Sequence, residues 1–179
     1  MTNFVVKTTA AVALTLMGTA SFAESLSTSA SATALPTVDK IEVTTELDAI
    51  ENAEAAKVWA NIDDDLTAKL VNRLEGRADT EGSDIVIDID EVSLASSFEQ
   101  AVGAEKAYLK GDVVLRNPGP DDNEYYTLTV RAEQAQAYFP DGKIVTDLST
   151  GSGVYYQAML DAFADNVILN LDKSNLNKG

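Results

Sequence analysis

The chain has 179 residues, with 13 basic and 29 acidic side chains and with neither cysteine nor histidine. Its formal net charge of −16 repels nucleic-acid phosphates and anionic lipid headgroups, so we expect no nucleic-acid partner. Without cysteine and histidine, the Ser-His-Asp and Cys-His catalytic systems and the usual zinc ligand sets cannot be assembled. Disulfides are excluded as well, so the fold must depend on its hydrophobic core.

Residues 1–23 have the layout of a cleavable secretory signal peptide. One positive charge, at Lys7, precedes an uncharged stretch, and Ser21 and Ala23 place small residues before a cut at Glu24. The apolar stretch is about half of the ~20 residues that a membrane-spanning helix needs, and no cysteine follows it to carry a lipid. We expect export to the periplasm, cleavage after Ala23 and no stable membrane insertion afterwards. A retained anchor and a buried helix are the alternatives.

The remaining sequence divides into a leader, a domain and a tail. Residues 24–37 are rich in Ser, Thr and Ala, which predicts a flexible leader. Residues 38–172 have the apolar patterning of a single domain, and 173–179 form a polar tail. The signal removes one lysine and no acid, so the exported chain is even more acidic than the whole. This acidity predicts solubility, with an acidic docking face for a basic partner as the alternative.

The first half of the domain begins with a strand and continues as a helix. Ile41 and Val43 alternate with polar neighbours, which predicts a short strand. Across 50–75, apolar residues recur at helical spacing, and Gly76 ends the pattern. Whether the turns from Leu47 onward belong to this helix stays open.

A second strand is predicted over 85–89, where isoleucines alternate with Val86 and Asp88. Val92 and Leu94 then place apolar side chains on the opposite parity. A β-bulge near residues 90–91 would produce this switch, so we expect one there.

The second half of the domain predicts a hairpin and a final helix. Strands over 108–116 and 125–137 are joined by a turn at 117–123, which contains two prolines and a glycine. Residues 143–148 predict a short additional edge strand. Apolar residues at helical spacing predict a last helix over about 154–171.

The order of these elements, β–α–β–β–β–α, predicts an α+β fold. Each helix has one apolar stripe and each strand one apolar face. The simplest burial places both amphipathic helices on one face of a largely antiparallel sheet of four to five strands, a two-layer sandwich.

The glycine- and serine-rich stretch 149–153 precedes the last helix, where backbone amides could hold a phosphate. The Lys-Ser/Thr pair of a P-loop is missing, and so is a dinucleotide fingerprint. We therefore expect a turn in which Ser152 caps the helix.

Three groups of acidic residues could bind calcium, but none has the spacing or the convergence that six or more oxygen ligands require. We expect solvated surface at each, with weak calcium binding as the alternative. The groups are Asp63, Asp64 and Asp65; Asp84, Asp88 and Asp90; and Asp121, Asp122 and Glu124.

The aromatic residues have core or sheet positions. Trp59 is expected in the core rather than at a ligand platform. Tyr108, Tyr125, Tyr126 and Tyr138 fall in predicted strands, where cross-strand pairing is the simplest role. A partner-binding surface on an open sheet face is the alternative.

The pattern also resembles a family of small envelope proteins. After the leader and the first strand, the helix ends Leu-Val-Asn-Arg-Leu-Glu-Gly at 70–76, and Ser-Asp-Ile-Val-Ile-Asp-Ile-Asp-Glu follows at 83–91 before the hairpin and the last helix. Over about 38–172 this order is similar to the auxiliary lipoproteins of ABC-type transport systems and to the lipopolysaccharide-assembly lipoprotein fold. The resemblance implies two helices on a small sheet and a non-catalytic adaptor function. Many of those proteins are lipidated on a cysteine, which this chain lacks.

The sequence therefore predicts a periplasmic, non-catalytic adaptor or binding module of the bacterial cell envelope, with another envelope protein as its partner. We assign no catalytic, cofactor-binding or metal-binding residue and no cofactor, and we expect no enzymatic activity. A small-ligand or calcium-binding protein and, further away, a carboxylate-based hydrolase are the alternatives.

Overall fold

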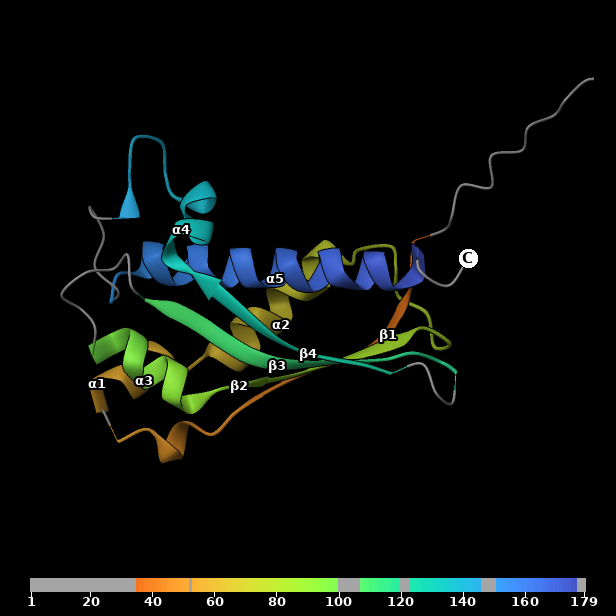
Figure 1. The fold of residues 1–179 in the computed structure, drawn as a ribbon, viewed down its shortest axis with the longest axis horizontal. Coiled ribbons are helices and arrows are strands. Elements are labelled where there is room, and N and C mark those ends of the chain that lie inside the picture. Colours follow the sequence, from red (N-terminus) through yellow and green to blue (C-terminus); the bar gives the residue numbers. More distant parts are fainter. Residues whose placement is uncertain (1–34, 52, 100–106, 120–122, 146–150, 177–179) are drawn as a thin grey trace, which may run out of the picture. The chain divides into compact units, whose positions relative to one another are not determined.

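A four-stranded mixed sheet, in the order β1-β2-β3-β4, organises this computed structural model (Figure 1). The structure describes residues 35–51, 53–99, 107–119, 123–145 and 151–176. The strands are β1 (Val38–Thr45), β2 (Ser83–Ile89), β3 (Tyr108–Arg116) and β4 (Glu124–Arg131). β1 is parallel to β2, and the other two pairings are antiparallel. The predicted α+β class is confirmed.

Helices α2 (Ile62–Arg73) and α5 (Gly153–Leu176) pack against each other and against the sheet. Parallel neighbours need a crossover connection, and α2 provides it between β1 and β2. Two shorter helices, α1 (Ala53–Val58) and α3 (Glu91–Glu99), contact each other at one end of the sheet (Figure 1). The short helices η1 (Leu47–Ala49), α4 (Ala132–Ala135) and η3 (Gln136–Tyr138) complete the described elements.

The alternation along β2 explains how the sheet is covered. Ile85, Ile87 and Ile89 are 0 %, 0 % and 2 % exposed, whereas the intervening Val86 and Asp88 are half-buried and exposed. Successive strand residues point to opposite faces, so one face of β2 meets the helices and the other does not. The predicted two-layer arrangement follows from this alternation.

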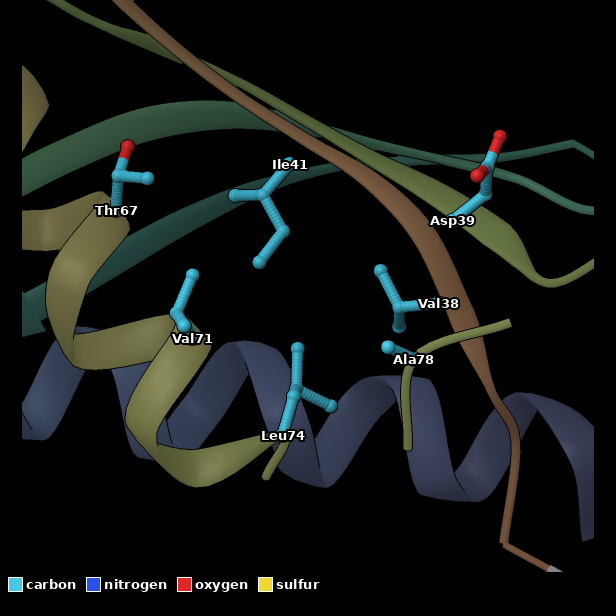
Figure 2. A pocket seen from close by; sticks show the side chains of 7 residues that line it. All are labelled: Val38, Asp39, Ile41, Thr67, Val71, Leu74 and Ala78. Atoms are coloured by element: carbon cyan, nitrogen blue, oxygen red, sulfur yellow. The ribbon is translucent and has the colours of Figure 1, made fainter. Parts of the chain in front are cut away.

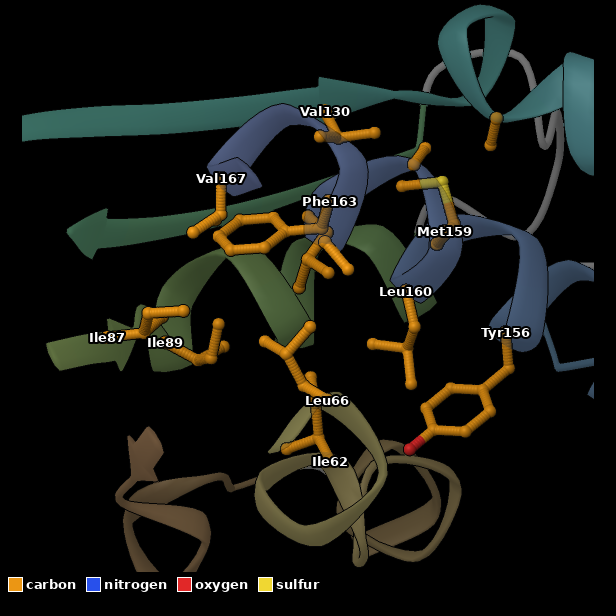
Figure 3. Close-up of a cluster of buried hydrophobic side chains, with 14 of the residues drawn as sticks. Ile62, Leu66, Ile87, Ile89, Val130, Tyr156, Met159, Leu160, Phe163 and Val167 are labelled. Carbon is orange, nitrogen blue, oxygen red and sulfur yellow. The ribbon is translucent and has the colours of Figure 1, made fainter. Parts of the chain in front are cut away.

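The core lies between that covered face and the two long helices (Figure 3). Leu66 from α2 and Phe163 from α5 are both fully buried, and they meet the isoleucines of β2 within one cluster. The periodicity over 50–75 therefore marks a core stripe, but it belongs to two helices, α1 and α2, and the turns from Leu47 form a separate element, η1. Gly76, with φ of +77°, follows the end of α2 and takes a conformation that favours glycine.

Ion pairs fasten α2 to α5 outside the core. Lys69 Nζ lies 2.7 Å from Asp161 Oδ1, and Arg73 Nη2 lies 3.0 Å from the same oxygen. Arg73 Nε also donates to Asp165. The same short stretch of α2 thus contacts two successive turns of α5.

The bulge predicted near residues 90–91 is wrong. The chain begins α3 at Glu91, and Ser93 N donates to Asp90 Oδ1 at 3.3 Å, an N-terminal capping contact. Leu94 is buried because the side-chain period changes from the strand repeat of two to the helical repeat. A change of period and a bulge give the same short sequence pattern.

Three other parts of the chain also differ from the expectation. β4 ends at Arg131 rather than at 137, and the next residues form α4 and η3, with Ala132 and Ala135 buried. Residues 143–145 are not a strand, and 146–148 lie outside the described residues. α5 runs from Gly153 to Leu176 and so enters the segment expected to be a polar tail.

Candidate functional site

The face of the sheet opposite α2 and α5 is the first candidate surface, and we call it the open face. In the part of the chain that the structure describes, none of its side chains is buried. Its residues are Lys40, Glu42 and Thr44 of β1, Asp84, Val86 and Asp88 of β2, Lys110, Asp112, Val114 and Arg116 of β3, and Tyr125, Thr127 and Thr129 of β4.

An apolar row crosses the open face. Strand register places Val86 opposite Val114, and Val114 opposite Tyr125. Tyr125 is 71 % exposed, although neighbouring residues of its own strand are half-buried. An aromatic ring thus stands in solvent beside Val114, with Val86 one strand farther along the row.

A polar row formed by Thr44, Asp88, Asp112 and Thr127 borders the apolar one. Thr127 Oγ1 donates to Asp112 Oδ1 at 2.6 Å, and Thr44 Oγ1 donates to Asp88 Oδ1 at 3.3 Å. The apolar row of the open face is therefore bordered, on the side of Asp88 and Asp112, by carboxylates that accept hydrogen bonds. This arrangement can contact a partner, and the two carboxylates that face each other in it, Asp88 and Asp112, are each hydrogen-bonded to a threonine.

A groove between β1 and α2 is the second candidate surface (Figure 2). It has a volume of about 230 Å³, and Figure 2 shows Ile41 of β1 pointing toward Val71 and Leu74. Val71 is 53 % exposed. The lining residues are Val38, Asp39, Ile41, Thr67, Val71, Leu74 and Ala78.

The same groove borders the outer edge of β1. Val38 N donates to Arg77 O at 2.8 Å, and Asp79 N donates to Val38 O at 3.0 Å, so the edge is closed at its first residue. Among the described residues, no backbone hydrogen bond extends from 39–45 outside the sheet. An open strand edge thus lies next to an apolar groove.

The acidic groups do not converge. Asp65 accepts a hydrogen bond from Tyr156 Oη at 2.8 Å. Burial, and then the charge of Asp64, raise the pKa of Asp63. Within the described residues, no three acidic side chains are placed to hold a metal ion.

The other two acidic groups are also dispersed. Asp84 and Asp88 lie on the open face, whereas Asp90 pairs with Lys110 at 2.6 Å. Glu124 is half-buried on β4, and residues 121 and 122 lie outside the described part. The structure therefore brings together at most two members of either group.

The predicted cap of the last helix is confirmed. Tyr155 N donates to Ser152 Oγ at 3.1 Å, and Tyr156 N donates to Ser152 O at 3.0 Å. Residues 149 and 150 lie outside the described part of the chain.

The aromatic residues separate into core and surface. Trp59 is 1 % exposed, and its ring meets that of Tyr156 edge-on at 5.3 Å, which confirms its core placement. Tyr126 points to the helix side, opposite Val113 in the register. Tyr138 lies in η3 rather than in a strand, and its hydroxyl donates to Asp165.

Tyr108, the fourth tyrosine, is half-buried at the start of β3, where its backbone amide donates to Ser97 Oγ at 3.1 Å. Of the four tyrosines expected in the sheet, only Tyr125 stands in the exposed apolar row. The groove went unrecognised in the sequence. The sequence feature that could have indicated the groove is Val71, an apolar residue of α2 that lies outside the core stripe. It is missed when only the core positions of the helix are counted.

Comparison with known proteins identifies no family. No protein-family model and no curated protein matches the chain. Among solved structures, the chain is similar to one from Caulobacter crescentus named "putative lipoprotein", with 13 % identity and a TM-score of 0.36, over 78 % of this chain and 92 % of that one. A likeness at this level carries neither fold nor function from that protein to this one. In the described residues, no helix is both long and apolar enough to cross a membrane.

Proposed function

We propose that this protein is a non-catalytic binding module, or adaptor, of the bacterial cell envelope, which presents its open face to another protein. The apolar row of Val86, Val114 and Tyr125 carries the proposal. A tyrosine that is 71 % exposed at the end of a row with two valines has apolar surface to bury on contact. Aromatic residues are enriched at the centres of protein interfaces, where polar residues form the rim.

The non-catalytic part of the proposal rests on the side-chain inventory. The chain lacks histidine and cysteine, and no three described carboxylates are grouped to hold a metal ion. Asp88 and Asp112 lie opposite each other on the open face, but each accepts a hydrogen bond from a threonine hydroxyl. A carboxylate hydrolase needs two carboxyl groups facing one substrate bond, one of them with a raised pKa. The Asp63 carboxyl has a raised pKa, but its sequence neighbours point in other directions around the helix.

The envelope part rests on residues 1–23 and is tested separately. N-terminal sequencing of the protein recovered from the periplasm should start at Glu24 or within a few residues of it. Recovery of the chain from the cytoplasm with Met1 intact would contradict export. The binding-module proposal would then stand without the envelope.

The binding surface is tested by cross-linking in the native cell. A photoreactive amino acid at Tyr125 should give a discrete cross-linked species of higher mass. The same probe at Leu169, which is 49 % exposed on α5, is the matched control and should give none. Equal cross-linking at both positions, or none at Tyr125, would contradict the open face as the binding surface.

A further inference from the structure

We propose that the outer edge of β1 and the groove beside it form a dimerisation site, where β1 of a second copy of this chain pairs in antiparallel fashion about a two-fold axis at Ile41. This inference goes beyond the proposed function and uses a different surface from the open face. Its occupant is the same protein, because the edge is complementary to itself.

The free edge is the first observation. β1 is the outermost strand of the sheet. The bridge between Val38 and Ala78 closes the edge at one end. Beyond it, residues 39–45 make no backbone hydrogen bond outside the sheet to any described residue. Such an edge is a template for a further strand.

Charge selects one register. Lys40 Nζ lies 2.8 Å from Glu42 Oε2, and the two side chains are 63 % and 43 % exposed on the open face. A two-fold axis at Ile41 places Lys40 of each copy opposite Glu42 of the other. Four alternating charges then form one cluster, and opposite charges directly across a strand pair are stabilising.

Neighbouring registers lack this match. An axis at Lys40 places the two Lys40 side chains opposite each other, and an axis at Glu42 does the same for the two Glu42 side chains. Like charges directly opposite destabilise a strand pair. An axis at Val43 places Glu42 opposite Thr44, and it places Lys40 opposite Glu46, which lies beyond the end of β1.

The groove supports the same register. Ile41 and Val43 face the helices, opposite Ile85 and Ile87 of β2 in the register. With the axis at Ile41, Ile41 of the second copy lies opposite Ile41 of the first, and Val43 of the second lies opposite Asp39 of the first. Both meet the first copy at the groove that Val71 and Leu74 line. An axis at Val43 would place Thr45 opposite Ile41 instead.

The pairing is short. The Val38–Ala78 bridge limits it to residues 39–43 of each copy, or about 17 Å of strand. The large net negative charge of each copy also opposes association. We therefore expect a dimer that dissociates on dilution, not an obligate one.

The first experiment measures sedimentation over a concentration series, with the chain as the cell processes it. The wild type should shift from one copy to two as concentration rises. Lys40→Glu and Glu42→Lys should each weaken the dimer by about tenfold or more. Lys143→Glu and Glu133→Lys, which make the same charge changes at exposed positions away from β1, should leave it intact.

Mixing the two single variants is the decisive arm. In the mixed dimer, both charges of one copy are negative and both of the other are positive, so every cross-strand pair is attractive. The mixture should dimerise although neither variant does alone. The Lys40–Glu42 pair within each copy stays broken in the mixture, so restoration cannot come from repair of that pair. A wild type that stays monomeric would overturn the proposal. So would a dimer whose dissociation constant neither charge reversal changes.

A cysteine cross-link tests the axis itself. The chain has no cysteine, so Ile41→Cys introduces a single thiol per copy. Facing residues in an antiparallel pair have Cα atoms about 4.5–5.5 Å apart, within the range for a disulfide. Under mild oxidation this variant should form a covalent dimer, whereas Thr44→Cys, six residues from its own counterpart in this register, should not. Faster cross-linking at position 44 would overturn the proposed axis.

Discussion

The two faces of the sheet come from the same strands and have opposite properties. On the covered face, Ile85, Ile87 and Ile89 are almost completely buried under α2 and α5. On the open face, Asp84, Val86 and Asp88 alternate with them along the same strand, and none is buried. One strand therefore contributes both to the core and to the surface.

This difference separates stability from recognition. Burial of a large apolar side chain contributes about 1.5–3 kcal/mol to folding, so substitutions on the covered face should change the free energy of unfolding. Exposed positions usually change it by less than about 0.5 kcal/mol. The open face can therefore carry a partner-binding sequence at little cost to the fold.

The largest effect is expected in the core. Ile87→Ala and Leu66→Ala each remove a fully buried side chain from the layer between helices and sheet. Each should lower the free energy of unfolding by about 2–5 kcal/mol, with no disulfide to limit the loss. Thermal or chemical denaturation measures the change.

The control for this comparison is Val86→Thr, on the open face of the same strand. It should change the free energy of unfolding by less than about 0.5 kcal/mol. If Ile87→Ala were as mild as Val86→Thr, the assignment of the two faces would be wrong.

A smaller effect is expected at Gly111, where the core leaves no room for a side chain. An added Cβ would lie 3.0 Å from Asp88 O, 3.1 Å from Ile89 Cδ1 and 3.2 Å from Phe163 Cζ. Gly111→Ala should therefore lower the free energy of unfolding by about 1–3 kcal/mol through overpacking. Gly153→Ala, where a Cβ meets nothing within 4 Å, is the matched control. A stabilising Gly111→Ala would mean that α5 lies farther from the sheet.

A still smaller effect on stability is expected at the ion pairs between α2 and α5. Arg73→Met removes the contacts to Asp161 and Asp165. Because these groups are partly exposed, we expect a loss of about 1 kcal/mol at neutral pH, reduced by high salt. Lys143→Met, at an exposed position, should have no measurable effect.

The same variant should change the response to acid. Burial opposes ionisation of Asp165, but hydrogen bonds from Tyr138 and Arg73 outweigh it and hold the pKa of that carboxyl below its usual value. The resulting stabilisation is present above about pH 4, the range of an unfolded aspartate, and is lost as the pH falls through the lower pKa of the folded state. In the Arg73→Met variant, the free energy of unfolding should therefore fall less steeply as the pH is lowered through this range. The measurement is the free energy of unfolding as a function of pH, and an unchanged slope below about pH 4 would contradict the role of Arg73.

The sequence was sufficient for the parts of the fold that follow one period over many residues. The alternation at 85–89 and the helical spacing of Leu66 and Leu70 each indicate one buried face, and both are confirmed. The cap at Ser152 was also readable, because a serine before an apolar helix satisfies its free amides.

The sequence was insufficient where two structures share one short pattern. Leu94 has the parity of a bulge and also of a helix that begins at Glu91, and only the packing of α3 against β3 separates them. Ala132 has the parity of the core residues Leu128 and Val130, yet residues 132–138 form two helical turns. A single alanine on the strand's parity also fits a helix, in which Ala132 and Ala135, three residues apart, both face the core.

The candidate surfaces were less predictable than the fold. Each depends on neighbours that are distant in sequence: Tyr125 acquires its apolar row from Val86 and Val114 across the sheet. Val71 becomes part of a groove only because α2 crosses beside Ile41. Strand order and register, which local patterns leave open, create both surfaces.

The smallest effect should come from calcium on the acidic groups. With 29 acidic and 13 basic residues, repulsion among carboxylates should weaken as salt rises, so sodium chloride should raise the melting midpoint. On the open face, Asp84 lies opposite Arg116, which moderates that repulsion, whereas Asp88 lies opposite Asp112, which adds to it. Calcium at the same ionic strength should add nothing further, whereas a true site would add about 2.7 kcal/mol at a hundredfold excess over its Kd.

Melting curves in sodium chloride and in millimolar calcium at matched ionic strength make this test. For a chain of this size, each kcal/mol corresponds to about 2–4 °C in the midpoint. A calcium-specific rise of that size that Asp84→Asn with Asp88→Asn abolishes would make the open face a cation site. The same result with Asp121→Asn and Asp122→Asn would assign the site to those two residues. Either result would favour a cation-binding protein over an adaptor, because the carboxylates would then converge on an ion. Equal midpoints would leave the acidic residues as solvated surface around the apolar row.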